Sequence, residues 1–277
     1  MSNIATHRIR VGACECLIVK DGTAGNPNLD EFMQPVPPEL ADYEMFMEGG
    51  LMLIDDADRR ILLDAGNGPN RGPRTHAAEA AFAAADITPA SVDIILLTHG
   101  DPDHIGGLLS ADGALVYPNA RFILHQDLWE AWHAPPEAGL YFPSQAAAVR
   151  RLVELLRDRL VDTGSLVDTE CEVSPGIRAI PALGHRVGHT AYLIESSGQR
   201  LLHIGDAAFD PVFLQHTGIP NVRDTSPEQA RDTRRMLVER AIAEEAAVVG
   251  SHFRLPGVGK LTRRGEDRYT WIPVASN

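Results

Sequence analysis

Apolar residues recur in short runs along the chain, and their spacing predicts a protein in which strands alternate with helices. Each run is about strand length, and most are bounded by Gly, Pro, Asp or Asn. The runs cover residues 15–19, 50–54, 60–63, 93–97, 121–124, 178–181, 190–195, 200–204 and 246–249. Apolar residues spaced three and four apart predict helices over 75–85, 144–160 and 226–244. The alternation of the two patterns indicates the α/β (α+β) class.

The predicted helix over 226–244 carries the clearest start signal. Ser226 is predicted to be its N-cap, Pro227 its first helical residue, and Glu228 an acidic residue that supports the helix dipole. The helix over 144–160 keeps one face apolar, through Val149, Leu152, Val153, Leu156 and Leu160.

Three segments without a clear helix or strand pattern are candidates for covering a site. Two of them are long connections, residues 21–43 and 209–225, and loops of this length inside a compact domain are commonly functional. The third segment, 129–142, holds Trp129, Trp132, Tyr141 and Phe142. Any one of these aromatic side chains alone would be ordinary packing at a helix end, but as a group they are candidates for pocket walls.

The composition narrows the classes of function. The chain has 277 residues and is 44% hydrophobic, so it can bury a sizeable core, and we expect a single domain over 1–277. Its formal net charge of −13 and isoelectric point near 5.2 leave little basis for neutralising phosphates, so nucleic acid is not expected as a partner. No segment approaches the roughly 18 consecutive apolar residues of a membrane span, so no membrane partner is expected.

The first residues and the cysteines bear on the compartment. The stretch "MSNIATHRIRVGACECLIV" lacks the uninterrupted apolar segment of a signal peptide, so we expect cytoplasmic residence. Cys14, Cys16 and Cys171 are expected to be buried, reduced thiols. A metal role for the first two would need further soft ligands nearby.

The candidate chemistry begins at "LLTHGDPDHIGG", residues 96–107, where four potential metal ligands follow an apolar run. His99, Asp101, Asp103 and His104 leave the chain where a buried strand is expected to end and a loop to open into a helix at 105–107. Imidazole and carboxylate ligands suit zinc, iron and manganese. Because ligands at this spacing cannot all face one ion, the cluster needs either two ions or partners from elsewhere in the chain.

Further histidines and aspartates stand just beyond other apolar runs, each near a glycine. They are His185 and His189 in "ALGHRVGHT", Asp206 in "LLHIGDAA" and His252 in "AVVGSHF". Ligands at strand ends are what a layered sheet scaffold presents along one rim. His189 is expected either to orient a ligand or to serve as a packing residue.

The motifs "THGDPDHIGG", "LGHRVGHTAYLIESSGQRLLHIGDA" and "GSHFRLPGVG", in this order, resemble those of the metallo-β-lactamase fold superfamily. The resemblance covers roughly residues 45–274 and is closest to the branch that holds methyl parathion hydrolase and the quorum-quenching lactonases. It implies a four-layer αββα sandwich with a dinuclear metal site at the rim between the two sheets.

The resemblance also implies a set of ligands for two divalent metal ions, with zinc foremost. The first ion would be bound by His99, Asp101 and His185, the second by Asp103, His104 and His252, and Asp206 would bridge the two. His189 is not a ligand in this scheme. Asp103 and Asp206 are the residues expected to be catalytic.

Metal-assisted hydrolysis is the mechanism that the resemblance implies. Two metal ions would lower the pKa of a bridging water so that hydroxide exists near neutral pH, and would polarise a carbonyl or phosphoryl oxygen. We therefore expect a hydrolase of an uncharged ester, lactone or organophosphate-type small molecule. Two alternatives stay open: an iron-dependent oxygenase or redox protein on the same fold, and a non-catalytic ligand-binding protein with a degenerate metal site. Because relatives of this branch are often dimers, a homodimer is implied.

Asp101 departs from the usual HxHxDH pattern of the family, which has a histidine at this position. A carboxylate here adds negative charge to a site that already holds Asp103 and Asp206, which should raise the pKa of the bound water. Three outcomes are open: a working site with a harder metal such as iron or manganese, a weak first site that leaves one zinc, or a loss of catalysis.

Position 209 is a second departure, because many acyl-homoserine lactonases of the superfamily carry a tyrosine three residues after the bridging aspartate. This chain has phenylalanine there, which weakens the case for homoserine lactones as substrates. We expect an apolar substrate pocket formed by Phe209, Trp129, Trp132, Phe142 and Phe213. Such a pocket would suit esters, lactones or organophosphate triesters.

Overall fold

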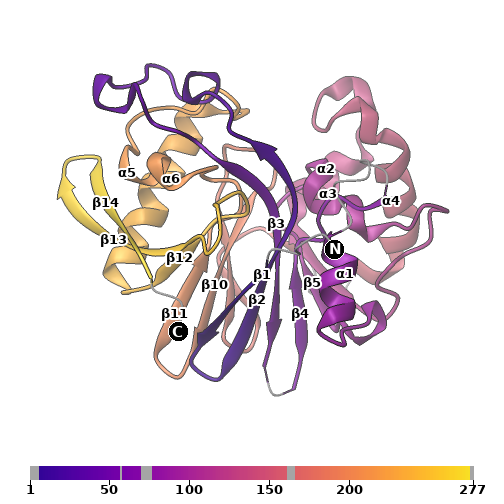
Figure 1. Cartoon of the computed structure of the whole chain (residues 1–277). Coiled ribbons are helices and arrows are strands. Elements are labelled where there is room, and N and C mark those ends of the chain that lie inside the picture. Colours follow the sequence, from indigo (N-terminus) through magenta and orange to yellow (C-terminus); the bar gives the residue numbers. More distant parts are fainter. Residues whose placement is uncertain (1–5, 57, 70–76, 161–165, 275–277) are drawn as a thin grey trace.

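The computed structural model describes residues 6–56, 58–69, 77–160 and 166–274. Two seven-stranded sheets lie face to face, and helices cover the outer face of each sheet (Figure 1). The layers therefore run helix, sheet, sheet, helix, and the predicted αββα sandwich is confirmed.

The first sheet takes its strands in sequence order. They are β1 (Thr6–Val11), β2 (Cys14–Gly25), β3 (Met47–Asp55), β4 (Arg60–Leu63), β5 (Ile94–Leu96), β6 (Arg121–His125) and β7 (Leu166–Val167). The pairs from β1 to β4 are antiparallel and those from β4 to β7 are parallel. The helices that pack on its outer face are α1 (Ala77–Ala84), α3 (Gln126–His133) and α4 (Ala146–Leu160).

The second sheet takes its strands in the reverse order. From one edge to the other they are β14 (Arg268–Pro273), β13 (Val258–Gly265), β12 (Ala247–Val249), β11 (Gln199–His203), β10 (Thr190–Ser196), β9 (Ile177–Pro181) and β8 (Cys171–Ser174). The β11 and β12 pair is parallel and the other pairs are antiparallel. The helices that cover its outer face are α5 (Pro211–Gln215) and α6 (Pro227–Ala243).

The alternation of side chains along each strand builds separate cores on the two faces of each sheet. On β2, Leu17 and Val19 join the core under the helices, whereas Cys16 and Ile18 join the core between the sheets. Successive side chains of a strand point to opposite faces, so both faces of such a strand must be apolar when both are covered. This explains why the central strands appear in the sequence as continuous apolar runs.

All nine predicted strands overlap strands of the structure. The strands that the apolar runs missed are the four edge strands β1, β7, β8 and β14, together with β13 beside one of them. Edge strands bury less surface and carry more polar residues than central ones. In β1, for example, Thr6, Arg8 and Arg10 are exposed, so no apolar run marks the strand.

The helices agree with the sequence patterns except at their ends. Helices α4 and α6 lie within the predicted ranges, and α1 accounts for the described part of 75–85, since residues 75 and 76 lie outside the described residues. Ser226 is at the N-cap of α6 and Pro227 follows it, but the Ser226 side chain makes no capping hydrogen bond. Among the residues that the structure describes, no helix is long and apolar enough to cross a membrane.

The helix expected at 105–107 begins earlier than predicted. Helix α2 covers Pro102–Ile105, and Gly106–Leu108 forms a 3-10 turn after it. Asp101 is the N-cap of α2, and a proline at the first helical position is compatible with a helix start. Asp103 and His104 therefore lie on a helix rather than in a loop.

The two long connections pack on each other. Strand β2 runs to Gly25, so the first residues of 21–43 are strand rather than loop, and the remainder includes 3-10 turns at Leu29–Glu31 and Pro38–Leu40. The connection 209–225 includes α5, and the Val222 backbone N–H donates to the Phe32 carbonyl at 2.8 Å. These two segments therefore form one cover over the second sheet.

The cysteines differ from the expectation in their burial. All three are free; Cys16 is buried, but Cys14 and Cys171 are half-buried. The groups of potential metal ligands among the described residues include no cysteine.

Candidate metal centre

The predicted ligands converge on one rim of the molecule, where strands of both sheets end. From the first sheet, His99 follows β5, and Asp103 and His104 lie on α2. From the second sheet, His185 lies between β9 and β10, Asp206 follows β11, and His252 follows β12. The centre is therefore built between the two sheets, and neither sheet holds it alone.

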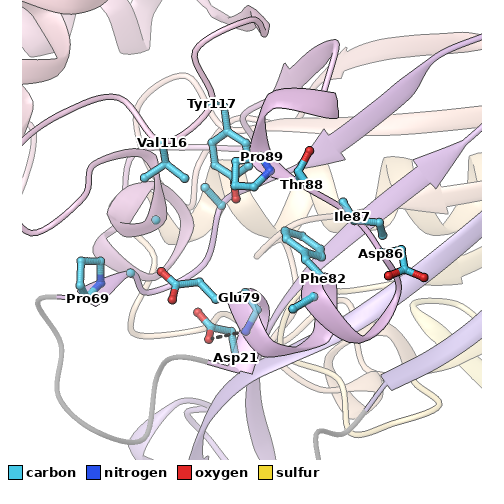
Figure 2. A pocket seen from close by; sticks show the side chains of 15 residues that line it. Asp21, Pro69, Glu79, Phe82, Asp86, Ile87, Thr88, Pro89, Val116 and Tyr117 are labelled. Carbon is cyan, nitrogen blue, oxygen red and sulfur yellow. Dashed lines mark hydrogen bonds between the residues drawn. The ribbon is translucent and has the colours of Figure 1, made fainter.

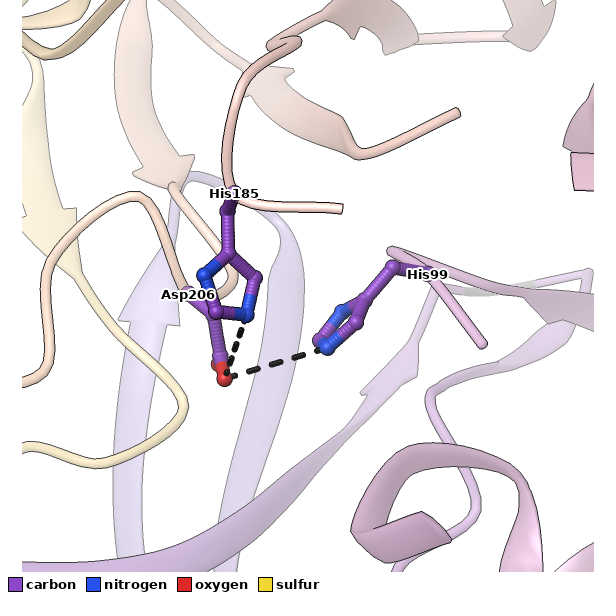
Figure 3. Close-up of side chains that lie close together, drawn as sticks. All are labelled: His99, His185 and Asp206. Atoms are coloured by element: carbon purple, nitrogen blue, oxygen red, sulfur yellow. Dashed lines mark ion pairs between the residues drawn. The ribbon is translucent and has the colours of Figure 1, made fainter. Parts of the chain in front are cut away.

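The first group consists of His99, His185 and Asp206, whose ligand atoms all lie within 4.8 Å of one another. Asp206 Oδ2 is 3.8 Å from His99 Nε2 and 3.6 Å from His185 Nε2. Figure 3 shows the two imidazoles approaching this carboxylate from different segments of the chain.

The second group consists of Asp103, His104 and His252, and its ligand atoms also lie within 4.8 Å of one another. Asp103 Oδ2 is 3.6 Å from His252 Nε2 and 3.9 Å from His104 Nε2. Asp206 reaches this group as well, since its Oδ1 is 3.4 Å from His104 Nε2 and its Oδ2 is 2.9 Å from His252 Nε2. Asp206 thus lies between the two groups.

Several atoms of the two groups are buried without a hydrogen-bond partner. They are His99 Nε2, His104 Nε2, His185 Nε2 and Asp206 Oδ1. Unpaired buried polar atoms are costly, and a cluster of them calls for a ligand. Imidazole nitrogen and carboxylate oxygen are donors that zinc and iron accept. The side chains therefore fit two divalent ions, one for each group, with Asp206 available to both.

A buried carboxylate fixes the orientation of the first-sheet histidines. Asp64 Oδ2 is 2.7 Å from His104 Nδ1, and the same carboxylate accepts from the Thr98 backbone and hydroxyl, each at 2.8 Å. Thr98 Oγ1 in turn is 3.0 Å from His99 Nδ1. With both Nδ1 atoms engaged, both histidines present Nε2 to the centre.

The second-sheet histidines are oriented by different partners. His185 Nδ1 is 2.9 Å from Asp224 Oδ1, and the other oxygen of Asp224 accepts from the buried guanidinium of Arg234 at 3.1 Å. His252 Nδ1 is 3.1 Å from the Glu48 carbonyl oxygen. These contacts again leave Nε2 to face the centre.

Sequence reasoning missed the partners that orient these histidines. Asp64 had a usable signal, because it follows the apolar run of β4 in the same way that Asp206 follows that of β11. Asp224 had none, since it lies in the connection 209–225 and contacts His185 only through the fold. Glu48 contributes a backbone oxygen, which no pattern of side chains can indicate.

His189 holds the backbone of Asp206, one of the predicted ligands. Its Nδ1 donates to the Ala182 carbonyl at 2.8 Å, and its Nε2 accepts from the Asp206 backbone N–H at 3.0 Å. Burial, followed by the nearby His99 and His185, lowers the pKa of His189 well below its ordinary value. A neutral His189 with both nitrogens engaged is placed to hold Asp206 rather than to bind a metal.

Asp101 is shared between the first group and an arginine. Its Oδ2 is 3.6 Å from His99 Nε2 and 3.9 Å from His185 Nε2, while Arg186 Nε is 3.0 Å from its carboxylate. Burial raises the pKa of Asp101, but His99 and Arg186 lower it by more, so the pKa lies well below its ordinary value. The structure places an ionised carboxylate beside the first group.

Burial and charge act in opposite directions on the groups at the centre. Burial raises the pKa of Asp206, but the contacts with His252 and His104 outweigh it and hold that pKa well below its ordinary value. Burial lowers the pKa of His104, but Asp206 and Asp64 raise it well above its ordinary value. The protein atoms alone therefore keep Asp206 negatively charged, which favours a cation at the centre.

The predicted pocket residues divide into two classes. The Phe209 ring lies edge-on to His185 and His252, with centroid distances of 5.4 and 5.2 Å. Phe142 is 44% exposed, and the Arg186 guanidinium lies 5.6 Å from its ring. Phe209 therefore lies beside the centre, and Phe142 lies beside Arg186, at the surface near the centre. Phe32, which contacts Phe209 at 5.6 Å, was not predicted.

The other three predicted pocket residues are buried in the hydrophobic cores, so their place in a pocket stays a prediction. Phe213 is completely buried under the second sheet, where it contacts Arg234. Trp129 and Trp132 are buried between α3, α4 and the first sheet. These side chains complete the packing of helices on sheets, which an apolar pattern cannot distinguish from a pocket wall.

A cavity of about 410 Å³ lies beside α1 and shares no residue with the two metal-facing groups. Figure 2 shows Phe82, Ile87, Val116 and Tyr117 around it, with the carboxylate of Glu79 at one side. The described residues of its lining are mainly apolar and include no histidine. The cavity therefore adds nothing to the metal centre.

A family model described as the metallo-beta-lactamase superfamily matches residues 51–252. The match includes the predicted ligands from His99 to His252 and covers more than half of the chain. The chain belongs to the metallo-β-lactamase superfamily, as its motifs predicted.

Known relatives and solved structures agree with this assignment. Probable metallo-hydrolases of Mycobacterium bovis and Mycobacterium tuberculosis are each 30% identical over 182 residues, 57% of this chain and 56% of theirs. The chain thus spans about half the length of the curated relatives it matches.

Among solved structures, the hydrolase AbOPH of the beta lactamase superfamily has a TM-score of 0.83 at 22% identity, over 99% of each chain. AidC, a dizinc quorum-quenching lactonase in complex with a product, has a TM-score of 0.83 at 22% identity, over 98% of each chain. These likenesses establish the fold.

Proposed function

We propose that the protein is a metal-dependent hydrolase of an uncharged ester, lactone or organophosphate-type small molecule. The observation that carries the proposal is the set of unpaired, buried Nε2 atoms of His99, His104 and His185 around Asp206. When bound there, two divalent ions, zinc foremost, would lower the pKa of a coordinated water and polarise the carbonyl or phosphoryl oxygen of the substrate. Asp206 would contact both ions.

The protein's own contribution is to hold the donors in place before any ligand arrives. Asp64 and Asp224 fix the imidazoles of His104 and His185, and His189 fixes the backbone of Asp206. Donors that are fixed in advance need little reorganisation during the reaction, which is the main source of electrostatic catalysis.

The centre is accessible to solvent on the side where the carboxylates of Asp101 and Asp103 lie, at the start of α2. The Asp103 side chain is 25% exposed and that of Asp101 is 14% exposed, whereas His99, His104 and His185 are almost completely buried. A substrate would therefore approach past Asp103 and Asp101, and Asp103 is available to contact the reacting groups. The apolar ring of Phe209 beside the second-sheet histidines supports an uncharged substrate.

Metal analysis and hydrolysis of activated substrates test the proposal together. The purified protein should hold close to two equivalents of divalent metal and should hydrolyse p-nitrophenyl acetate, paraoxon or a simple lactone. Chelator should abolish the activity and added zinc should restore it. The variant His185→Ala should lose activity, while His7→Ala, which changes a histidine of β1 outside the centre, should retain it. A metal-loaded protein that is inert toward a broad panel of esters, lactones and phosphotriesters would refute the proposal.

A second candidate function, an iron-dependent oxygenase or redox protein, is favoured by one contact. Asp101 Oδ2 lies within 4 Å of His99 Nε2 and His185 Nε2, and two histidines with one carboxylate are a common ligand set of non-haem iron. Anaerobic purification followed by elemental analysis separates the two candidates. Zinc as the dominant metal at two equivalents would count against the redox function, and iron at one equivalent or more would favour it.

A further inference from the structure

Arg186 stands directly after the ligand His185 and pairs with the carboxylate that departs from the family pattern. Its Nε lies 3.0 Å from Oδ1 and 3.0 Å from Oδ2 of Asp101. The same carboxylate approaches His99 Nε2 at 3.6 Å. The Asp101 carboxylate therefore contacts the guanidinium with both oxygens and approaches the first group with Oδ2.

The Arg186 side chain is held from three directions, unlike that of a free surface arginine. One of its terminal nitrogens, Nη1, donates to the carbonyl of His185 and to that of Arg223, each at 2.8 Å. Its guanidinium carbon lies 5.6 Å from the centre of the Phe142 ring. The side chain is 21% exposed. Because its position is defined by these contacts, its charge is delivered at a defined place beside Asp101.

The formal charges near the centre explain what the arginine can do. With a neutral histidine at position 101, the usual family pattern leaves Asp103 and Asp206 as the negatively charged ligands. Here Asp101 adds a third, and Arg186 returns the formal charge to the same value. A paired carboxylate and guanidinium are together neutral, as an imidazole ligand is.

We propose that Arg186 is a positioning residue that holds Asp101 and cancels its charge, so that the Asp101 and Arg186 pair takes the electrostatic place of a neutral histidine. The inference rests on the proposed function only in that metal must bind at the first group. It assigns no substrate and does not depend on turnover.

A purely structural role makes a different prediction. If Arg186 only tethers the segment that carries His185, its removal should weaken metal binding whatever residue occupies position 101. If Arg186 cancels the charge of Asp101, the two substitutions should act in opposite directions and should compensate each other. A double-mutant cycle on metal affinity therefore separates the two roles.

The test compares zinc affinity and stoichiometry in four full-length proteins: wild type, Arg186→Gln, Asp101→Asn and the double variant. Affinity is measured by competition with a chromophoric chelator at fixed pH and salt. Arg186→Gln leaves Asp101 uncompensated and should bind zinc at the first group at least about tenfold more tightly. Asp101→Asn leaves Arg186 uncompensated and should weaken zinc binding at that group at least about tenfold. The double variant should return close to wild type.

Two further variants keep the test interpretable. Arg186→Lys retains the positive charge and should restore affinity toward that of wild type. Arg10→Gln removes a charge from an exposed arginine of β1 that pairs with Glu15, and it should leave zinc binding unchanged. Circular dichroism of each variant checks that the fold is intact.

The possible results are distinguishable. Equal weakening of zinc binding by Arg186→Gln in both backgrounds would overturn the inference and leave the proposed function standing. A wild-type protein that binds no divalent metal would overturn both. Opposite and compensating shifts would support the inference, even if no substrate has been found.

Discussion

The first group of predicted ligands (His99, His185 and Asp206) and the second group (Asp103, His104 and His252) have their histidines oriented in the same way, but they differ in the cations that lie near them. In each group a buried carboxylate orients a histidine: Asp224 holds His185 in the first, and Asp64 holds His104 in the second. The cations near them are placed differently. Arg186 is partly exposed and paired with Asp101 at the first group, whereas Lys20 is buried behind the second.

The Lys20 contacts show what this difference means. Lys20 Nζ donates a long hydrogen bond of 3.4 Å to the carbonyl of Ser251, the residue before His252. Burial lowers the pKa of Lys20 to about 8, although Glu48 acts against this shift. A paired, partly solvated guanidinium costs little, but a buried ammonium with weak pairing opposes folding. At the first group, the charge of Asp101 is therefore balanced by Arg186. Near the second group, the buried charge of Lys20 lowers the stability of the folded protein.

Asp206→Asn should have the largest effect, because it should impair metal binding at both groups. Asp206 contacts the histidines of both, so Asp206→Asn should lower the metal content of both positions. The loss of hydrolysis should exceed the roughly 100-fold that removal of an outer partner of a metal ligand can cause. Elemental analysis and kcat/KM on an activated ester measure the two effects. Retention of two equivalents of metal by this variant would show that Asp206 is not shared between the ions.

A matched pair of substitutions separates the groups. Asp64→Asn should weaken metal binding more at the second group than at the first, because Asp64 contacts His104 directly and reaches His99 only through Thr98. Asp224→Asn should weaken binding at the first group, and each main effect should be roughly 10- to 100-fold. Zinc titration with a competing chelator measures both, with the other group as internal reference. A main effect of both variants on the same position would contradict the assignment of these carboxylates to different groups.

The same pair should differ in stability. Asp224 is the charged partner of Arg234, whose side chain is completely buried, so Asp224→Asn leaves this cation with only the carbonyl oxygens of Ala207 and Ile219. The free energy of unfolding should fall by about 3–5 kcal/mol. Asp64→Asn removes a partner of buried His104, but an imidazole can release its proton whereas a guanidinium cannot, so this variant should lose less stability. Urea denaturation of the two metal-free variants compares them, and an equal loss would count against the role given to Arg234.

Lys20→Met should stabilise the protein. Burial lowers the pKa of Lys20 from 10.5 to about 8, which corresponds to a cost of about 3 kcal/mol near neutral pH. Between about pH 8 and pH 10.5 the unfolded chain binds more protons at Lys20 than the folded chain does. The stability of the wild-type protein therefore rises with pH, and the gain in stability from Lys20→Met becomes smaller. Urea denaturation from pH 7 to 10 tests this. The exposed Lys260, the other lysine of the chain, serves as control; an equal gain from Lys260→Met would refute the argument.

The substitution Phe209→Tyr should have the smallest effect, a change in substrate preference. Phe209 lies edge-on to His185 of the first group and His252 of the second. Phe209→Tyr adds a hydroxyl that can donate to a substrate carbonyl, and one such hydrogen bond corresponds to roughly a two- to tenfold gain. The ratio of lactone to phosphotriester turnover should therefore rise. Phe213→Tyr, within the core, should lower stability without this shift in preference, and equal changes in both variants would argue against a role for position 209.

Much of the architecture followed from local pattern. Continuous apolar runs marked the central strands because these are covered on both faces, and the residues just beyond them, such as His99 and Asp206, were recognisable as ligand candidates. The edge strands carried no such signal. Aromatic residues such as Trp132 and Phe213, which are buried, show the limit of such patterns, because an apolar side chain looks the same in sequence whether it faces a core or a ligand.

The family, the order of the layers and the identity of the ligand candidates could all be predicted from the sequence, because strand ends, glycines and ligand types are local features. The division of these candidates into two groups and the contacts that support them depend on the folded chain. Folding brought Asp224 to His185 across 39 positions and Arg186 to Asp101 across 85. Such contacts depend on how two sheets meet at one rim. Electrostatic balance is a property of distances in space, so the meaning of the carboxylate at position 101 becomes clear only beside the guanidinium that faces it.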